Sequence, residues 1–311
     1  MHGYYQKMDY LFGPVLSRRL GLSMGVDLLS SKTCNLDCVY CELGKTHCLT
    51  TARCRFVPAD KVLREIKSRA DEAFDHLTFA GSGEPTLSCD LGEIIRAARK
   101  LVDVPIAVIT NSTLLTSPEV RREVAAADIV LPSLDAASQK TFQAINQPAP
   151  ALRIEEIIDG LRSFREEFQG EIWLEVMLVK GVNEHEADLI AKAASSISPD
   201  RIQLNTVVRP PAEPVDPLTE REMLEMLGVF DGAEIIPDWD WSVPAQMQDR
   251  LLDLLSRRPC TLEEICSLLK WESSDAIKYC KIMEREGMIQ RRMHGGKLFF
   301  HAPFYAPDFE S

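Results

Sequence analysis

Residues 31–44 read SKTCNLDCVYCELG and place Cys34, Cys38 and Cys41 in a Cys-x3-Cys-x2-Cys spacing. Three thiolates so close together can surround one iron–sulfur cube. Because a [4Fe–4S] cluster normally takes four cysteine ligands, three leave one iron open to another ligand. The alternative is a zinc loop, but zinc ribbons favour two Cys-x2–4-Cys pairs and a second pair is not obvious here. We therefore interpret this loop as a [4Fe–4S] cluster site.

The sequence on either side of this loop predicts an α/β fold. Short apolar segments alternate with helix-period segments from about residue 21 to residue 230, which is typical of βα units around a parallel sheet. The six expected strands are residues 21–29, 76–82, 106–112, 128–135, 171–180 and 201–208. The expected helices between them are residues 58–73, 91–102, 118–126, 154–168 and 184–196. Six strands are too few for a closed eight-stranded barrel, so we expect a partial (β/α)6 TIM-type barrel or a doubly wound sheet.

The C-terminal part has a different pattern and predicts a second domain. A proline-rich stretch at residues 209–217 precedes an expected helix at residues 218–230. Helical segments then follow at residues 245–257, 261–269 and 273–286, with Thr261 and Glu264 spaced as a capping box. Residues 288–293 and 297–302 read as a two-stranded ribbon. We expect two domains, residues 1–243 and residues 244–311, of which the second resembles a winged helix-turn-helix.

Composition and charge restrict the class of protein. The net charge of −12 argues against extensive nucleic-acid binding by the barrel, because phosphate binding uses clustered Lys and Arg. No apolar run approaches the roughly 20 residues of a membrane helix. The N-terminal residues lack the pattern of a secretory signal, so we expect a cytoplasmic protein. Nine cysteines are an odd number and, in that compartment, are better read as metal ligands or buried thiols than as disulfides.

A second motif, GSGEPT at residues 81–86, stands at the end of the second expected strand. Small residues let the backbone approach a ligand, and Glu84 can accept a hydrogen bond from an ammonium group. The alternative is a plain turn with a solvated glutamate. In parallel α/β folds ligand groups gather beyond the carboxyl ends of the strands, where both motifs fall.

Together the two motifs resemble the radical S-adenosylmethionine (SAM) superfamily over about residues 12–209. The resemblance implies that Cys34, Cys38 and Cys41 hold a [4Fe–4S] cluster whose open iron binds the amino and carboxylate groups of SAM. It also implies that reductive cleavage of SAM gives a 5′-deoxyadenosyl radical, which abstracts hydrogen from a substrate. Ser82 departs from the family's Gly-Gly-Glu-Pro motif by replacing the first of its paired glycines.

The resemblance also implies a set of SAM contacts. Tyr40 matches the aromatic position that packs near adenine, and polar residues at other strand ends match groups that contact ribose, carboxylate or substrate. Each of those strand-end residues has an alternative role as a turn cap or a sheet-edge polar residue. Glu175, Lys180 and Asn205 are weaker candidates. The expected cofactor-binding residues are Tyr40, Gly83, Glu84, Pro85, Asn111, Ser133 and Asp135.

Residues 12–28, FGPVLSRRLGLSMGVDL, resemble the N-terminal signature of a subfamily related to the tRNA wyosine-forming enzymes. Arg18 and Arg19 could bind an anionic substrate, or could be structural surface residues. The acidic body argues against a tRNA substrate.

Six further cysteines lie outside the loop. The spacing of Cys48, Cys54 and Cys89 matches no auxiliary-cluster motif, which favours buried or incidental thiols. The other three fall in the C-terminal domain and are expected in its core; they are Cys260, Cys266 and Cys280.

The leading hypothesis is a radical SAM enzyme that acts on a peptide, an RNA or a small metabolite, and draws electrons from a donor such as flavodoxin or ferredoxin. One alternative is a DNA-binding regulator that uses the cluster as a redox sensor. The GSGEPT loop argues against it, because a sensor needs no site for the amino group of SAM. Another alternative is an activase that installs a radical on a partner enzyme.

Overall fold

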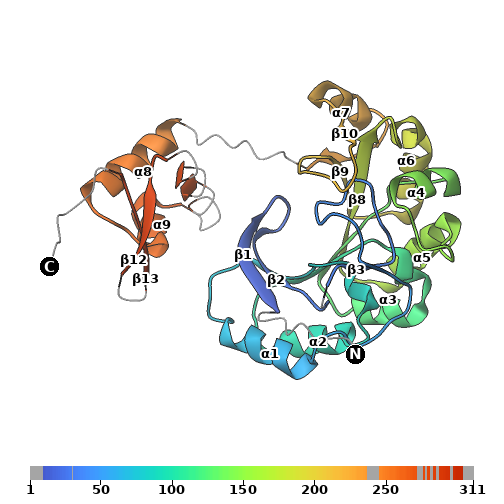
Figure 1. The fold of residues 1–311 in the computed structure, drawn as a ribbon, viewed down its shortest axis with the longest axis horizontal. Coiled ribbons are helices and arrows are strands. Elements are labelled where there is room, and N and C mark those ends of the chain that lie inside the picture. The colour runs from blue at the N-terminus through green and yellow to red at the C-terminus, as the bar shows by residue number, and fades with distance from the viewer. Residues whose placement is uncertain are drawn as a thin grey trace. The chain divides into compact units, whose positions relative to one another are not determined.

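The computed structural model describes residues 10–29, 31–236, 245–271, 276, 279–280, 283–284, 287–294 and 297–303. The chain divides into two compact units (Figure 1). The first consists of Met1–Val15 and Ser23–Ile236, and the second of Leu16–Leu22 and Pro237–Ser311. The expected boundary at residues 243–244 lies outside the described residues and stays a prediction.

One nine-stranded sheet forms the centre of the first unit. Its path runs β1 (Leu11–Ser17), β2 (Gly21–Val26), β5 (His76–Phe79), β6 (Ile106–Thr110), β7 (Ile129–Pro132), β8 (Glu171–Lys180), β9 (Arg201–Thr206) and β11 (Glu234–Ile235). The short β10 (Asp216–Pro217) pairs antiparallel with β8. The pairings from β2 to β9 are parallel, which confirms all six expected strands.

The strand order decides between the two expected sheet types. Each parallel strand from β2 to β9 lies beside the one before it in the sequence, without the reversal of order that defines a doubly wound sheet. Sequential order is the arrangement of a TIM-type barrel, so the doubly wound alternative is wrong.

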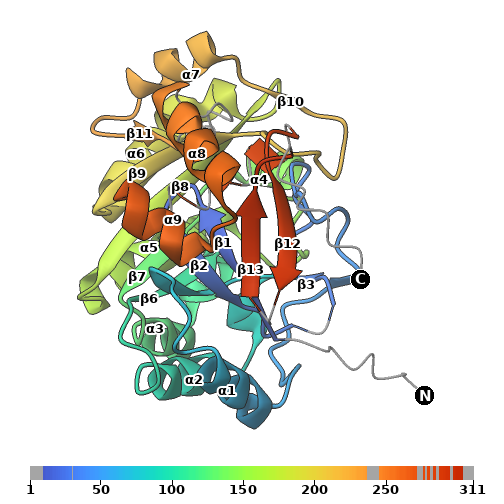
Figure 2. The same ribbon diagram turned by 90° about the vertical axis from the view of Figure 1, so that its left-hand side faces the viewer.

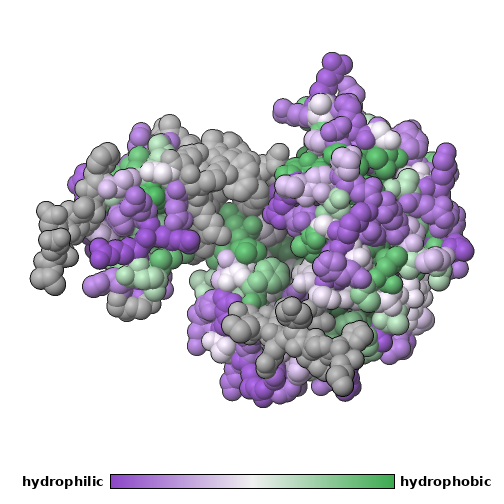
Figure 3. Space-filling model, in the orientation of Figure 1, coloured by the Kyte–Doolittle hydropathy of each residue, from purple (hydrophilic) through white to green (hydrophobic). Residues whose placement is uncertain are grey.

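Helices follow the strands and lie around the outside of the sheet in Figure 1. They are α1 (Ala59–Ser68), α2 (Leu91–Ala98), α3 (Pro118–Val124), α4 (Gln139–Ile145), α5 (Ile154–Glu167), α6 (Ala187–Ile197) and α7 (Glu220–Leu227). In α1 the buried residues Val62 and Ile66 are four positions apart, so they share the face that packs on the core. The opposite faces are polar, and the visible outer face of this unit is mostly hydrophilic (Figure 3). The sequence analysis did not predict α4.

The core of the first unit comes from strands that are covered on both faces. Leu77, Phe79, Val108, Val130 and Leu204 have no exposed surface. A parallel sheet covered on both faces reads as near-continuous apolar runs, which is why its strands were visible in the sequence.

The second unit contains α8 (Ala245–Arg257), α9 (Leu262–Leu269) and a hairpin of β12 (Gln290–His294) and β13 (Lys297–His301) (Figure 2). The capping box is confirmed: the Thr261 N–H donates to Glu264 Oε2 at 2.8 Å and the Glu264 N–H to Thr261 Oγ1 at 3.3 Å. Most of the expected helix at residues 273–286 lies outside the described residues. Among the residues that are described, the structure shows no helix with the length and apolar character needed to cross a membrane.

Candidate functional site

The cysteine loop leaves the sheet directly after β2 and is held by backbone hydrogen bonds. Thr33–Cys34 form β3, which pairs in parallel with β4 (Cys48–Leu49). The far side of the loop bonds to the chain that follows α4: the Asp37 N–H donates to Asn146 O at 3.0 Å and the Val39 N–H to Ile145 O at 2.9 Å. The loop is therefore fixed from two sides by segments distant in the sequence.

The three thiols of this loop fit an iron–sulfur cluster. Burial raises the pKa of the Cys34 thiol to about 12, with the charges of Glu84 and Cys41 adding to the effect. Burial also raises the pKa of Cys38, to which the charge of Cys34 contributes. The Cys34 sulfur therefore lies within range of the charges of Cys38 and Cys41, in a buried site where a bound cation would favour the thiolate forms.

The three cysteines do not form a single-ion site. Among the described residues no three His, Cys, Asp or Glu side chains converge as one metal ion requires. In a cluster each cysteine binds a separate iron, so its ligands need not converge on one point and the arrangement is compatible with a cluster.

Two asparagine side chains contact the cluster cysteines. Asn111 Nδ2 donates to Cys34 Sγ at 3.5 Å, and Asn146 Nδ2 donates to Cys38 Sγ at 3.3 Å. Asn111 was expected at the site, but as a SAM contact. Sequence reasoning missed Asn146, which follows the unexpected α4, and Asn35, whose Oδ1 accepts from Asn111 Nδ2 at 2.7 Å. Its position next to Cys34 was the one feature of the sequence that could have identified Asn35 as part of the site.

Gly83 packs against the cysteine loop. The Thr33 N–H donates to Ser82 O at 3.2 Å and the Glu84 N–H donates to Thr33 O at 3.1 Å. A Cβ added to Gly83 would lie 1.8 Å from the Thr33 carbonyl oxygen. The expectation was that a small residue here makes room for a ligand. The structure shows that the space beside Gly83 is filled by the residue before Cys34.

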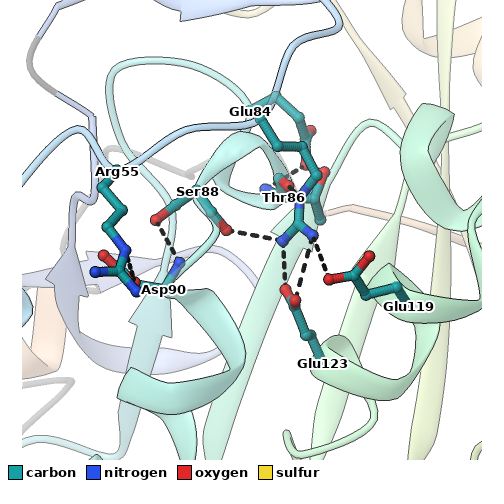
Figure 4. Close-up of polar contacts among 8 residues, drawn as sticks. Arg55, Glu84, Thr86, Ser88, Asp90, Glu119 and Glu123 are labelled. Atoms are coloured by element: carbon teal, nitrogen blue, oxygen red, sulfur yellow. Dashed lines mark hydrogen bonds and ion pairs between the residues drawn. The ribbon is translucent and has the colours of Figure 1, made fainter.

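Glu84 is buried and joins two strand ends. Its Oε1 accepts from Thr86 N at 3.0 Å and from Thr86 Oγ1 at 2.6 Å (Figure 4). It also accepts from Thr110 Oγ1 at 2.7 Å. Its Oε2 accepts from Asn111 N at 2.7 Å. Burial raises the pKa of this carboxyl in spite of these donors. The alternative of a solvated glutamate is therefore wrong. The neighbouring Pro85 begins a short 3-10 helix and is also buried.

Four expected SAM contacts line one pocket. Its lining combines polar side chains with apolar ones, several of them from α4 and α5. The expected residues among its walls are Tyr40, Asn111, Ser133 and Asp135. The other lining residues are Leu36, Leu134, Phe142, Asn146, Ile154 and Ile157. Gly83, Glu84 and Pro85 do not line this pocket.

Asp135 organises the polar side of the pocket. Its Oδ2 accepts from Tyr40 Oη at 2.5 Å and from Asn146 Nδ2 at 2.8 Å, and its Oδ1 accepts from Met177 N at 3.0 Å. Burial raises the pKa of Asp135 to about 6, although these donors oppose the shift. Ser133 also lines the pocket, and its N–H donates to Thr110 O at 3.0 Å.

The weaker candidates Glu175, Lys180 and Asn205 differ in burial. Asn205 Nδ2 donates to Glu175 Oε1 at 2.8 Å, so two of them form a buried pair between β9 and β8. Lys180 is an exposed strand end whose Nζ lies 2.8 Å from Glu222 Oε1. Arg18 and Arg19 lie in the turn between β1 and β2.

Comparisons with known proteins agree with this geometry. A UPF0026 protein of Methanocaldococcus jannaschii is 30% identical over 315 residues, covering 94% of this chain and 96% of that protein. A protein named GTPase Obg, of Brachyspira hyodysenteriae, is 33% identical over 307 residues, which is 94% of this chain. The chain spans 45% of the length of that relative.

A solved structure shows the same fold. The FeFe-hydrogenase maturase HydG of Carboxydothermus hydrogenoformans aligns with a TM-score of 0.51 and 15% identity, covering 77% of this chain and 58% of that one. The sequence pattern described as Radical SAM superfamily matches residues 28–194, from the end of β2 through most of α6. The chain therefore belongs to the radical SAM superfamily and the UPF0026 family, and its cofactors are a [4Fe–4S] cluster and S-adenosylmethionine.

Proposed function

We propose that this chain is an enzyme that cleaves SAM reductively and uses the resulting 5′-deoxyadenosyl radical to abstract hydrogen from a substrate. One observation carries the proposal: Asn111 and Asn146 each line the pocket and each donate to a cluster cysteine. The pocket therefore opens beside the sulfur atoms that would hold the cluster. A molecule bound there would lie next to the iron that lacks a cysteine.

The residues of the chain take distinct roles in this proposal. Cys34, Cys38 and Cys41 hold the cluster, which when bound supplies the electron that breaks a carbon–sulfur bond of SAM. Polar side chains of the pocket orient the nucleoside and carboxylate parts of SAM, and its apolar wall excludes water. The orienting residues are Tyr40, Asn111, Ser133 and Asp135.

We assign the Gly83-Glu84-Pro85 loop to the amino group of SAM. Glu84 Oε2 accepts one hydrogen bond from the described residues and retains capacity for another. The close packing of Gly83 on Thr33 holds this carboxylate at a fixed place beside the cysteine loop.

The test is product formation under anaerobic conditions. We would reconstitute the full chain with iron and sulfide, reduce it with dithionite, add SAM and quantify 5′-deoxyadenosine beside a Cys38→Ala control. We expect product from the wild type and none from the control. An intact cluster without product would contradict the proposal and favour the redox-sensing DNA-binding regulator, for which a DNA-binding screen would follow.

We further propose that residues 244–311 form a winged-helix-like domain that presents the substrate. The independent core, the capped α9 and the β12–β13 hairpin support this interpretation. We also propose a cytoplasmic location with flavodoxin or ferredoxin as the electron donor. Residues 12–28 support a relationship to the wyosine-forming branch of the superfamily.

A further inference from the structure

Three cysteines outside the cluster loop lie together at the surface of the first unit. Cys48, Cys54 and Cys89 are all exposed and all free thiols, whereas Cys34, Cys38 and Cys41 are only partly exposed. The sequence favoured buried or incidental thiols at these positions. Their exposure corrects the expectation of burial, and it makes the three sulfur atoms accessible to a metal.

Backbone pairing brings two of the three together. The Cys54 N–H donates to Leu87 O at 3.1 Å, and the Cys89 N–H donates to Cys54 O at 3.1 Å. Cys54 also forms a parallel bridge with Ser88. Cys54 and Cys89 therefore lie on adjacent chain segments although 35 positions separate them in the sequence.

Cys48 joins this pair from β4. Its strand pairs with β3, in which Cys48 stands opposite Thr33, and Thr33 in turn bonds to the GSGEPT loop that leads to Cys89. Burial raises the pKa of Cys54, and the charges of Cys89 and Cys48 raise it further, in that order. Cys89 and Cys48 therefore both lie near Cys54.

Two arginines fix the segment that carries Cys54. The Arg53 guanidinium donates to Thr86 O at 2.8 Å and to Ser88 O at 2.9 Å, and it is paired with Glu123. On the other side, Arg55 Nε lies 3.0 Å from Asp90 Oδ1. Charged side chains on both flanks of Cys54 therefore tie it to the loop of Cys89. The backbone positions of the two cysteines are set before any metal binds.

We propose that Cys48, Cys54 and Cys89 hold a second iron–sulfur cluster. Thiolates are the ligands that such clusters take, and three of them here repeat the donor set of the first site. This inference does not depend on SAM cleavage.

The experiment counts iron, acid-labile sulfide and zinc in four anaerobically purified and reconstituted full-length proteins. These are the wild type, the C48S/C54S/C89S variant, the C34A/C38A/C41A variant and a Cys266→Ser control from the second unit. With about four irons per cubane cluster, we expect about eight in the wild type and the control and about four in each triple variant. The C34A/C38A/C41A protein should retain a reducible cluster, seen by electron paramagnetic resonance after dithionite.

Several results would overturn the proposal. One is an unchanged iron content in the C48S/C54S/C89S variant. The others concern the C34A/C38A/C41A variant: zinc without sulfide, or no cluster although its circular dichroism spectrum stays native. A Cys54–Cys89 disulfide that persists under reductant in thiol titration would also overturn it. Because the readout is iron and sulfide, a failure of SAM cleavage in the separate assay leaves this result interpretable.

Discussion

The Asn146 carboxamide donates to Cys38 Sγ at 3.3 Å and to Asp135 Oδ2 at 2.8 Å. Both bonds come from the same NH2 group, so a single side chain links the cluster loop to the carboxylate that organises the pocket. Asn146 immediately follows α4, and its own carbonyl oxygen accepts from the Asp37 N–H. The position of the loop and the position of the pocket are therefore set by the same residue.

Replacing Asn146 by leucine should lower the reduction potential of the first cluster. Hydrogen bonds to the cysteine sulfurs stabilise the more negative, reduced state, and the variant removes one of them. It also leaves Asp135 short of a donor, so we expect a loss of about 1–3 kcal/mol in the free energy of unfolding. A potentiometric titration followed by electron paramagnetic resonance and a urea titration would measure the two effects.

The matched control for this change is Asn205→Leu. Asn205 donates to buried Glu175 rather than to a cluster cysteine, so its loss should reduce stability with a smaller shift of the potential than Asn146→Leu causes. Equal potentials in the wild type and in Asn146→Leu would show that the 3.3 Å contact does not influence the cluster.

Gly83→Ala should disrupt the cluster site. The added Cβ would lie 1.8 Å from the Thr33 carbonyl oxygen, a backbone atom that moves only if the cysteine loop moves. We expect a loss of at least about 1–3 kcal/mol in stability together with reduced iron loading.

Gly232→Ala provides the comparison for Gly83→Ala. That glycine has a φ of +69° but no atom within 4 Å of the added Cβ, so only the cost of a left-handed backbone, about 1–2 kcal/mol, applies. Normal iron loading in Gly83→Ala would contradict the packing argument.

The sequence predicted the sheet well because both of its faces are buried. Strands such as β8 appear in the sequence as continuous apolar runs, and the cysteine spacing predicted the loop between β2 and β5. The helix α4 was missed because it is short and its N-terminal Ser138 cap resembles an ordinary turn residue in the sequence.

The parts of the site that were missed depend on contacts between distant segments. Asn146 meets Cys38 across 108 positions, and no local pattern signals that pairing. The same limit applies to Gly83, which was expected to face a ligand because the sequence does not show that Thr33 lies beside it. Likewise, nothing in the sequence indicated that Cys54 and Cys89 lie on paired segments.

Arg53→Met should loosen the segment that carries Cys54. The guanidinium bonds to two carbonyl oxygens and pairs with the largely buried Glu123, which would lose its charge partner. Hydrogen bonds to charged groups contribute about 1.5–3 kcal/mol each, so we expect a loss of that order in the free energy of unfolding.

A double-mutant cycle with Glu123→Gln would isolate the Arg53 pair. If the two changes are coupled, the double variant should be more stable than the sum of the single losses predicts. Strict additivity in urea titrations would mean that the Arg53 effect comes from its bonds to Thr86 and Ser88 alone.

The stability of the cluster-free protein should depend on pH through Asp135. Its pKa is raised from 3.8 to about 6 by burial, so between these values the folded protein binds more protons than the unfolded chain. This contribution to stability is therefore greatest at low pH and falls as the pH rises toward 6. At roughly 1.4 kcal/mol per pKa unit, the loss of stability amounts to about 3 kcal/mol by pH 7.

The control is Asp135→Asn, whose side chain does not titrate, although it loses one of the hydrogen bonds of Asp135 at every pH. In urea titrations at pH 4, 5.5 and 7, the wild type should therefore decline relative to the variant by about that amount. Parallel profiles would mean that Asp135 has an ordinary pKa and that water reaches it in the pocket.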